Sequence, residues 1–287
     1  MTQQIRQLKA SEFPALLREM SQKPKLLYIR GTLPSVDLKY LCVVGSRAST
    51  PYGRRMTQKL IAELARYPIA IISGMALGID SEAHKAALDV GLPTVAVLPS
   101  SLDDMSLYPT SNKALAQRIL ARGGALISEN TAPFKAAPYS FAQRNRVMAG
   151  MSHATLIIEA GEKSGTLITA RLALDYNREV LAIPHELGRE SGTGANRLIR
   201  EGATLVRNGE DILQVLGLAP LENPTQGVLP TDLNEAEVKI MEALTEALVK
   251  DELIEETELS AQDASIALSS LLIRGLIVER LGKIERV

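Results

Sequence analysis

Short apolar runs alternate with longer amphipathic stretches through most of the chain, and this pattern constrains the fold more than any other feature. The runs are Tyr40–Gly45, Ile69–Ser73, Thr94–Leu98, Ala125–Ser128, Ala154–Glu159, Val180–Ile183 and Ala203–Val206. They are continuously apolar, which is typical of strands covered on both faces of a parallel sheet. The stretches between them predict helices over Gly53–Tyr67, Ser81–Val90, Lys113–Arg122, Ala142–Met151, Leu167–Asn177 and Ala195–Glu201. The alternation predicts an α/β fold with a doubly wound, mostly parallel sheet.

The regions before and after this pattern differ from it. Residues 1–39 form a short lead-in, where Ser11 is placed to cap a helix through Met20 and Leu26–Arg30 to add an edge strand. Prolines and a glycine mark a linker over residues 218–231. Residues 232–287 then predict a small winged-helix domain after the main domain, residues 40–217. Its expected elements are three helices and a hairpin turning at Leu281-Gly282, namely Asn234–Thr245, Lys250–Glu256, Ala261–Arg274 and Leu276–Val287.

Composition excludes several classes of protein. Hydrophobic residues make up 46% of the 287 and charged residues 23%, which excludes a disordered or fibrous chain. Cys42 is the only cysteine, so an intramolecular disulfide and a thiolate-rich metal site are excluded, and its apolar neighbours predict a buried thiol. No run approaches the roughly 20 apolar residues of a membrane span, and no signal peptide is visible. We therefore expect a cytoplasmic protein without a membrane association.

Charge is distributed unevenly along the chain. Met1–Val215 carries 26 Lys and Arg against 19 Asp and Glu, a net charge of +7. Leu216–Val287 carries 6 against 14, a net charge of −8. Net charge acts on association more than on fold, so the two regions are expected to have different partners. An anion is the natural partner of the first.

Glycine and hydroxyl residues follow several predicted strands, at the sheet edge where open α/β sheets bind ligands. Gly45-Ser46-Arg47 follows the first strand and Ser73-Gly74 the second, while Lys163-Ser164-Gly165-Thr166 opens a helix after the fifth. Glycines admit an anion to backbone N–H groups, and a helix N-terminus adds unpaired donors. Each turn alone is equally consistent with the tight geometry of a βα connection. Together, with Arg47 and Lys163 beside them, they favour a phosphate site.

The segment Arg144-Asn145-Arg146 adds two further cations. Residues at i and i+2 do not share a helix face, so one arginine is expected at the ligand and the other on a carboxylate such as Glu129 or Glu159. Four aromatic residues, Tyr108, Phe134, Tyr139 and Phe141, fall in loops at the same predicted edge. Cations beside aromatic rings are typical of sequence-tolerant single-strand binding, although each ring alone equally suits a loop sealed onto the domain.

Catalytic and cofactor patterns are weak by comparison. The glycines match neither a dinucleotide fingerprint nor a Walker loop, and no metal-ligand spacing is present, so we expect no cofactor and no metal. Asp80 and His84 are four residues apart and are interpreted as a structural pair. His153 is interpreted as structural, and His185 is placed to line the site.

Ordered sequence blocks also resemble the DNA-processing protein A family (DprA/Smf). They run from Val43-Val44-Gly45-Ser46-Arg47 through Ser73–Asp80 with His84, Tyr108-Pro109 with Asn112, Ile127-Ser128-Glu129, Phe141 with Arg144-Asn145-Arg146, Lys163–Thr166 and Ala182-Ile183-Pro184 to Glu201-Gly202-Ala203. The resemblance implies a Rossmann-like domain that binds single-stranded DNA and helps load RecA recombinase in natural transformation. It also implies a homodimer without catalytic activity.

The resemblance places Arg47, Phe141, Arg144 and Lys163 at or near the DNA pocket. Many family members carry a basic residue three positions before the aromatic residue, where this chain has Pro138, and Lys135 lies three residues earlier. Many also carry an N-terminal helical domain, for which residues 1–39 are too short. The DNA-binding residues expected from all these arguments are Gly45, Ser46, Arg47, Ser73, Gly74, Lys135, Phe141, Arg144, Asn145, Arg146, Lys163, Ser164, Gly165 and Thr166.

Two alternatives remain at this point. A Rossmann-like enzyme that cleaves nucleoside monophosphates would need a carboxylate at the reacting sugar, and Glu129 or Glu159 is placed to supply it. Alternatively, the winged helix reads DNA. The second alternative conflicts with charge, because Ala261–Arg274 carries only Asp263 and Arg274, whereas recognition helices present Arg, Lys, Asn or Gln to base edges.

Overall fold

The computed structural model describes residues 4–221, 233–244, 248–280, and 282–286, and the chain divides into two compact units. Met1–Pro220 is here called the α/β unit and Leu221–Val287 the C-terminal unit. Most of the predicted linker, from residue 222 on, lies outside the described residues, as does Leu281 of the predicted hairpin turn. Within the described part of the chain, no helix is long and apolar enough to cross a membrane.

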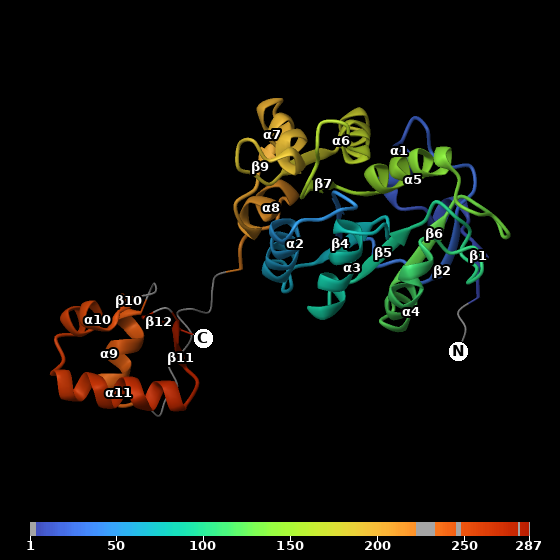
Figure 1. The fold of residues 1–287 in the computed structure, drawn as a ribbon. Helices are drawn as coiled ribbons and strands as arrows, with labels where there is room; N and C mark the ends of the chain where they lie inside the picture. Colours follow the sequence, from blue (N-terminus) through green and yellow to red (C-terminus); the bar gives the residue numbers. More distant parts are fainter. Residues whose placement is uncertain (1–3, 222–232, 245–247, 281, 287) are drawn as a thin grey trace. The chain divides into compact units, whose positions relative to one another are not determined.

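The α/β unit is built on a nine-stranded sheet with the strand order β1-β2-β6-β5-β4-β3-β7-β8-β9 (Figure 1). The seven strands from β3 to β9 are mutually parallel, and β1 and β2 add an antiparallel edge beside β6. Their bounds are β1 Arg6–Gln7, β2 Tyr28–Gly31, β3 Lys39–Val44, β4 Ile69–Ser73, β5 Thr94–Val97, β6 Ala125–Ser128, β7 Ala154–Ile157, β8 Glu179–Ala182 and β9 Thr204–Leu205. The predicted doubly wound α/β sheet is confirmed.

Helices cover both faces of this sheet. In Figure 1, α1, α5, α6 and α7 lie on one side of the strands, and α2, α3 and α4 lie on the other. The bounds are α1 Ala15–Glu19, α2 Pro51–Glu63, α3 Ile79–Asp89, α4 Lys113–Ala121, α5 Pro138–Met151, α6 Gly165–Asp175, α7 Thr193–Arg200 and α8 Gly209–Leu216, with 3₁₀ turns at Ala10–Glu12, Thr110–Asn112 and Glu190–Gly192. Helix α5 begins earlier than predicted because Pro138, with its fixed φ, suits the first helical turn.

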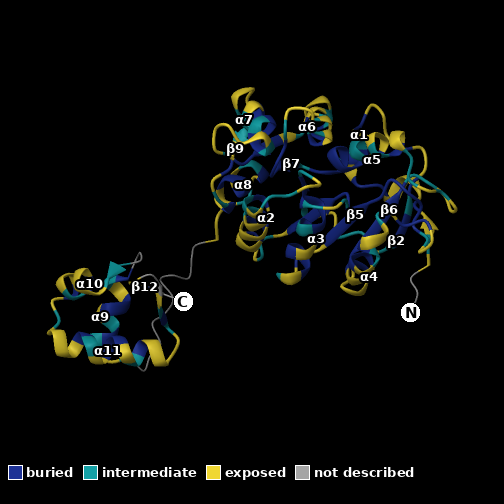
Figure 2. Ribbon diagram, viewed as in Figure 1, coloured by how far each residue is buried: buried dark blue, intermediate teal, exposed yellow. Residues whose placement is uncertain are grey.

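Successive residues of the strands enter separate cores, as the continuous apolar runs predict. Leu41 and Val43 of β3 pack with α2, α3 and α8, whereas Cys42 and Val44 pack with α5 and α6. Figure 2 shows the strands buried and the outer helix surfaces exposed. Cys42 is fully buried, and this burial raises the pKa of its thiol well above the usual range. The thiol is therefore a core group.

The lead-in belongs to the α/β unit and is not a separate segment. Strand β2 pairs with β6, and β1 pairs with β2. The buried side chains of Phe13, Leu17 and Met20 join the same core as the central strands. The predicted helix from Ser11 to Met20 is instead a 3₁₀ turn followed by the short α1, because Pro14 interrupts the run.

The order of the strands creates a switch point beside β3. Connections from β3 lead through β4, β5 and β6 toward one edge, and the chain then returns to place β7 on the other side of β3. In open α/β sheets, ligands bind outside the carboxyl ends of the strands at such a point. The loops after β3 and β7 are thus the place to look for a site.

The C-terminal unit contains the predicted helices and hairpin. Its elements are α9 Glu235–Ala243, β10 Leu248–Val249, α10 Lys250–Thr257, α11 Ala261–Ile273, β11 Ile277–Arg280 and β12 Lys283–Arg286. The strands form an antiparallel sheet in the order β10-β12-β11, where β10 is an addition to the prediction. Ser260 caps α11, since its side chain accepts a hydrogen bond from the Asp263 N–H at 3.1 Å. The unit has its own apolar core, which includes Ile240, Leu268, Leu271 and Ile284.

Candidate nucleic-acid interface

A cavity of about 450 Å³ lies at the switch point, and we call it the Arg47 cavity. Its walls come from the end of β3 and the loop after it, the loop after β4, the first turns of α5 and the N-terminus of α6. Nine of the fourteen predicted residues line it: Gly45, Ser46, Arg47, Phe141, Arg144, Asn145, Ser164, Gly165 and Thr166. The structure therefore brings together turns that are more than a hundred residues apart in sequence.

Arg47 and two aromatic side chains form a cluster beside this cavity: Arg47 and Phe141 line it, and Tyr108 lines a small adjoining hollow. The guanidinium carbon of Arg47 lies 4.8 Å from the centre of the Phe141 ring. The Tyr108 ring meets the Phe141 ring edge-on, with 5.6 Å between their centres. Within the described part of the chain, no carboxylate forms a salt bridge with Arg47. A cation held over a ring in this way is available to a phosphate while the aromatic surface is available to a base.

Contacts between two loops hold Arg47 in place. The Ile79 N–H, at the start of α3, donates to the Ser46 carbonyl at 3.1 Å. Gly78 has a φ of +79°, and a Cβ there would lie 2.2 Å from the Ser46 carbonyl oxygen and 2.5 Å from that of Arg47. Glycine is therefore required at position 78 by both conformation and close packing.

Helix α6 presents its N-terminus to the Arg47 cavity. Ser164 caps the helix, because its side-chain oxygen accepts a hydrogen bond from the Thr166 N–H at 3.2 Å. A Cβ at Gly165 would have no atom within 4 Å, so the backbone there faces open space. Lys163 is exposed immediately before the cap, although it is not a lining residue. The helix dipole, the backbone of Gly165 in open space and a nearby lysine together suit a phosphate.

A buried arginine and carboxylate form the floor of the site. Arg144 is 6% exposed and donates from Nη1 to the Val97 carbonyl at 2.8 Å. Asp80 is 5% exposed; burial raises the pKa of its carboxyl, and the Arg144 charge partly offsets that rise. A Cβ at Gly74 would lie 1.6 Å from Arg144 Nη1 and 2.6 Å from an Asp80 oxygen. Glycine at position 74 is thus explained by the guanidinium beside it.

Other predicted residues lie away from the Arg47 cavity or serve packing beside it. Ser73 is fully buried and donates its hydroxyl proton to the Val43 carbonyl at 2.7 Å. Arg146 pairs with Glu129, as predicted for one of the two arginines, and lines a separate hollow with Lys23 and Lys25. Lys135 is exposed in the loop before α5, outside the lining. Gly45 lines the cavity, but its Cβ position is filled by the Ile79 side chain at 2.7 Å.

Two further residues were not among the predicted DNA-binding residues: Asp80, which lines the Arg47 cavity, and Tyr108, which contacts Phe141 from the adjoining hollow. The expected pairing of Asp80 with His84 is wrong, because the Nδ1 atom of His84 lies 2.7 Å from the Thr94 hydroxyl oxygen. Burial lowers the pKa of His84 to about 3, so this imidazole is neutral. His153 is structural, since its Nδ1 accepts a hydrogen bond from the Tyr40 N–H at 3.0 Å. The sequence did offer a signal for Tyr108, because this aromatic residue lies in the loop after β5, at the predicted ligand-binding edge of the sheet.

The carboxylates that an enzyme would need are both engaged elsewhere. Glu129 is held by Arg146. Glu159 is fully buried and accepts hydrogen bonds from the N–H and the hydroxyl of Thr50, with the backbone bond at 3.0 Å. Neither residue lines the Arg47 cavity. This arrangement does not favour the cleavage of a nucleotide.

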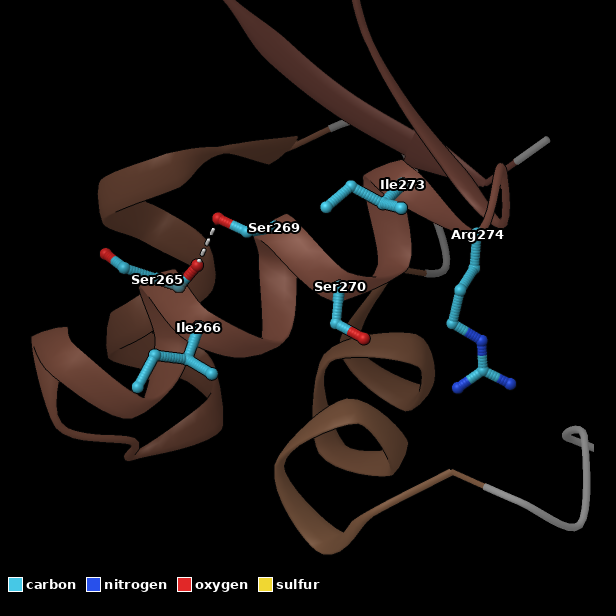
Figure 3. Close-up of a pocket in the computed structure, with 6 residues that line it drawn as sticks. All are labelled: Ser265, Ile266, Ser269, Ser270, Ile273 and Arg274. Carbon is cyan, nitrogen blue, oxygen red and sulfur yellow. Dashed lines mark hydrogen bonds between the residues drawn. The ribbon is translucent and has the colours of Figure 1, made fainter.

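The exposed side of α11 has a different chemistry. Figure 3 shows the six residues of an open groove along this helix: Ser265, Ile266, Ser269, Ser270, Ile273 and Arg274. Ile273 is 87% exposed, and the Ser269 hydroxyl donates to the Ser265 carbonyl. The only cation among the six, Arg274, pairs with Glu237 at 3.5 Å. The groove is apolar and hydroxylic, unlike the surface of a base-reading helix.

Fold and site together define a Rossmann-like protein with a cationic, aromatic cavity at the switch point of its sheet. The chain belongs to the family described as DNA recombination-mediator protein A, whose sequence model matches residues 4–217. It is 41% identical over 207 residues to Protein Smf of Escherichia coli, covering 72% of this chain and 55% of that protein. The chain spans 55–60% of the length of the first curated relatives.

Two solved structures agree with this family membership. The DNA processing protein A of Streptococcus pneumoniae matches with a TM-score of 0.67 and 33% identity, covering 74% of this chain and 75% of that one. The DNA processing protein A of Helicobacter pylori matches with a TM-score of 0.65 and 32% identity, covering 75% and 98%. The second structure is described as revealing that protein's single-stranded DNA binding mode.

Proposed function

We propose that the α/β unit binds single-stranded DNA in the Arg47 cavity, through phosphates first and bases second. The observation that carries the proposal is the cluster of Arg47 over the Phe141 ring, with Tyr108 edge-on beside it in an adjoining hollow. The cluster places a positive charge and aromatic surface together, which is the combination that sequence-tolerant strand binding uses. The net charge of +7 over Met1–Val215 adds a sequence-independent attraction for phosphate.

A single strand suits this arrangement better than a duplex. In a duplex the base faces are stacked on one another, so Phe141 and Tyr108 would have no base to contact. In a single strand every base has a free face, and stacking contributes about 1–3 kcal/mol per base. We therefore expect binding with little sequence preference.

Family membership supports a wider role. The Helicobacter pylori relative is described as binding single-stranded DNA, and the family is described as a mediator of recombination. We accordingly propose that this protein protects incoming single strands in the cytoplasm and helps to load RecA recombinase on them during natural transformation, acting as a homodimer. With Glu129 and Glu159 both engaged, we propose no catalytic activity for it.

A salt titration of DNA binding tests the proposal. Fluorescence anisotropy with the full chain should show tighter binding to an unstructured single strand than to a duplex. The slope of log affinity against log salt concentration should be about −0.7 per phosphate neutralised. Arg47→Ala and Lys163→Ala should weaken all sequences about equally, by roughly five- to tenfold for an interaction worth about 1 kcal/mol. Salt-independent binding, or a preference for duplex, would contradict the proposal.

A further inference from the structure

A second cavity lies at the same edge of the sheet, and its volume is about 510 Å³. It lies between the first turns of α2 and the loop that follows β8, and we call it the Arg55 cavity. Its lining includes Thr50, Tyr52, Arg55, His185 and Arg189. The functional argument for the Arg47 cavity does not use any of these residues.

One wall of the Arg55 cavity is rigid and aromatic. The rings of Tyr52 and His185 meet edge-on, with 5.2 Å between their centres. The Tyr52 hydroxyl donates to the Pro184 carbonyl at 2.9 Å, and Nε2 of His185 lies 2.7 Å from the Ile158 carbonyl oxygen. Asn196 also bonds the His185 backbone on both its N–H and its carbonyl. Such a fixed wall presents aromatic surface to a ligand at little cost in side-chain entropy.

The cations of the Arg55 cavity are available to an anion. Within the described part of the chain, no carboxylate forms a salt bridge with Arg55. Its positive charge acts on Tyr52, whose pKa is raised by burial and partly lowered again by Arg55. Arg189 pairs with Glu186, but both side chains are 70% exposed, and an exposed pair of this kind is worth little. The lining thus holds two arginines against one carboxylate.

The N-terminus of α2 does not supply the anion site by itself. The buried Glu159 carboxylate accepts the Thr50 N–H, and a Cβ at Gly53 would lie 2.4 Å from the carboxyl carbon of Glu159. This negative charge already compensates the helix dipole. A phosphate in the Arg55 cavity would therefore depend on Arg55.

The two cavities are close along the loop after β3. Arg47 lines the first cavity and Thr50 the second, and the three peptide units between their Cα atoms span at most about 11 Å. At about 3.4 Å per nucleotide of a stacked strand, that distance corresponds to about three nucleotides. A strand of more than about three nucleotides is therefore long enough to extend from a residue of one lining to a residue of the other.

We propose that the Arg55 cavity is a second nucleotide-binding site for the same DNA strand, in which Arg55 pairs with a phosphate and Tyr52 with His185 forms the wall for a base. This inference rests on the proposed function of the Arg47 cavity. It predicts that the second site contributes only when the strand is long enough to reach both cavities.

A length series of oligo(dT) strands, measured by anisotropy with the full chain, tests the inference. Strands of 3 and 15 nucleotides would be compared for the parent protein and for Arg55→Ala, Tyr52→Leu and Arg47→Ala. Arg54→Ala is the matched control, since Arg54 is the neighbouring arginine, does not line the cavity and donates to the Ser49 carbonyl. Arg55→Ala should leave the short strand unaffected and weaken the long strand about five- to tenfold. For the long strand, the slope of log affinity against log salt concentration should become less steep by about 0.7, the value for one phosphate.

The outcomes separate this inference from the proposed function. If Arg55→Ala equals the parent at both lengths while Arg47→Ala weakens both, the second site is wrong and the first stands. If the parent binds no single strand, the proposed function is wrong, and the inference falls with it. Equilibrium dialysis with thymidine monophosphate distinguishes a free nucleotide from a strand: mononucleotide binding that Arg55→Ala abolishes, without an effect of strand length, would also overturn the inference.

Discussion

The two units of this protein carry net charges of opposite sign. Met1–Val215 has a net charge of +7, and its cations gather with aromatic rings at one sheet edge. Leu216–Val287 has a net charge of −8, and the exposed side of α11 carries isoleucines and serines. The first surface suits a polyanion, whereas the second suits neither a phosphate backbone nor base edges.

This difference shows where function resides in each unit. In the α/β unit the strands are fully occupied with packing, so chemistry is confined to the loops at their carboxyl ends. In the C-terminal unit the exposed side of α11 offers an apolar groove, and the one cation in its lining, Arg274, is paired. Each unit also has its own core, so we expect the two units to fold and unfold independently.

The largest expected effect is on the C-terminal unit alone. Leu271 is fully buried among Ile240, Leu268 and Ile277. Leu271→Ala should destabilise this unit by about 3 kcal/mol, the usual cost of such a cavity. Calorimetry of the full chain should show the C-terminal transition lost or shifted to lower temperature. The transition of the α/β unit and the affinity for single strands should not change.

Leu272→Ala is the control for that experiment. Leu272 is the next residue on α11 but is 39% exposed, so its truncation should cost less than about 1 kcal/mol. A common shift of both transitions in Leu271→Ala would mean that the units unfold together. The expectation that the two units unfold independently would then be wrong.

The next effect concerns the floor of the Arg47 cavity. Gly74→Ala would bring a methyl group against the Arg144 guanidinium, which is fixed to the Val97 carbonyl. We expect a loss of about 2 kcal/mol in the stability of the α/β unit, as for other overpacked sites. Denaturant titration measures this loss as a change in the free energy of unfolding of the α/β unit.

Gly165→Ala is the matched glycine substitution. It places a methyl group in open space in the first turn of α6, so stability should be equal or slightly greater. If Gly74→Ala is as stable as the parent, Arg144 is free to move, and the site lacks the fixed floor described above.

The sequence predicted the sheet well because its signal is repeated and local. Each central strand is a continuous apolar run, and β4 and β6 match their predicted bounds without error. Turn composition also located the Arg47 cavity, since loops after parallel strands must meet at one edge. Residues 1–39 gave a weaker signal, because β1 has only two residues and α1 only five.

The roles of single residues were harder to predict, because they depend on contacts distant in sequence. Gly74 looked like an anion turn, yet the group beside it is Arg144, seventy residues later. His84 was paired with Asp80 from helical spacing, but Thr94 on β5 supplies a hydrogen-bond partner. Spacing did indicate that Arg144 and Arg146 diverge, and only the fold shows that Arg146 lies with Glu129 away from the Arg47 cavity.

The smallest expected effect is that of the C-terminal unit, which is acidic, on DNA binding. Truncation after Gly217 should leave single-strand affinity equal or up to about threefold tighter, because a tethered anionic module can compete with phosphate at millimolar effective concentration. Debye screening over about 8 Å at physiological salt limits this competition, so the difference should shrink as salt rises. Anisotropy on the full chain and on the truncated protein, at low and high salt, measures it. The melting temperature of the α/β unit should change little, since Leu218 is the one described residue among those removed that packs on its core, and this separates competition from a contact with the C-terminal unit that stabilises the α/β unit. A large loss of affinity with unchanged melting would instead mean that the C-terminal unit holds DNA, and the contrast between the two surfaces would have to be abandoned.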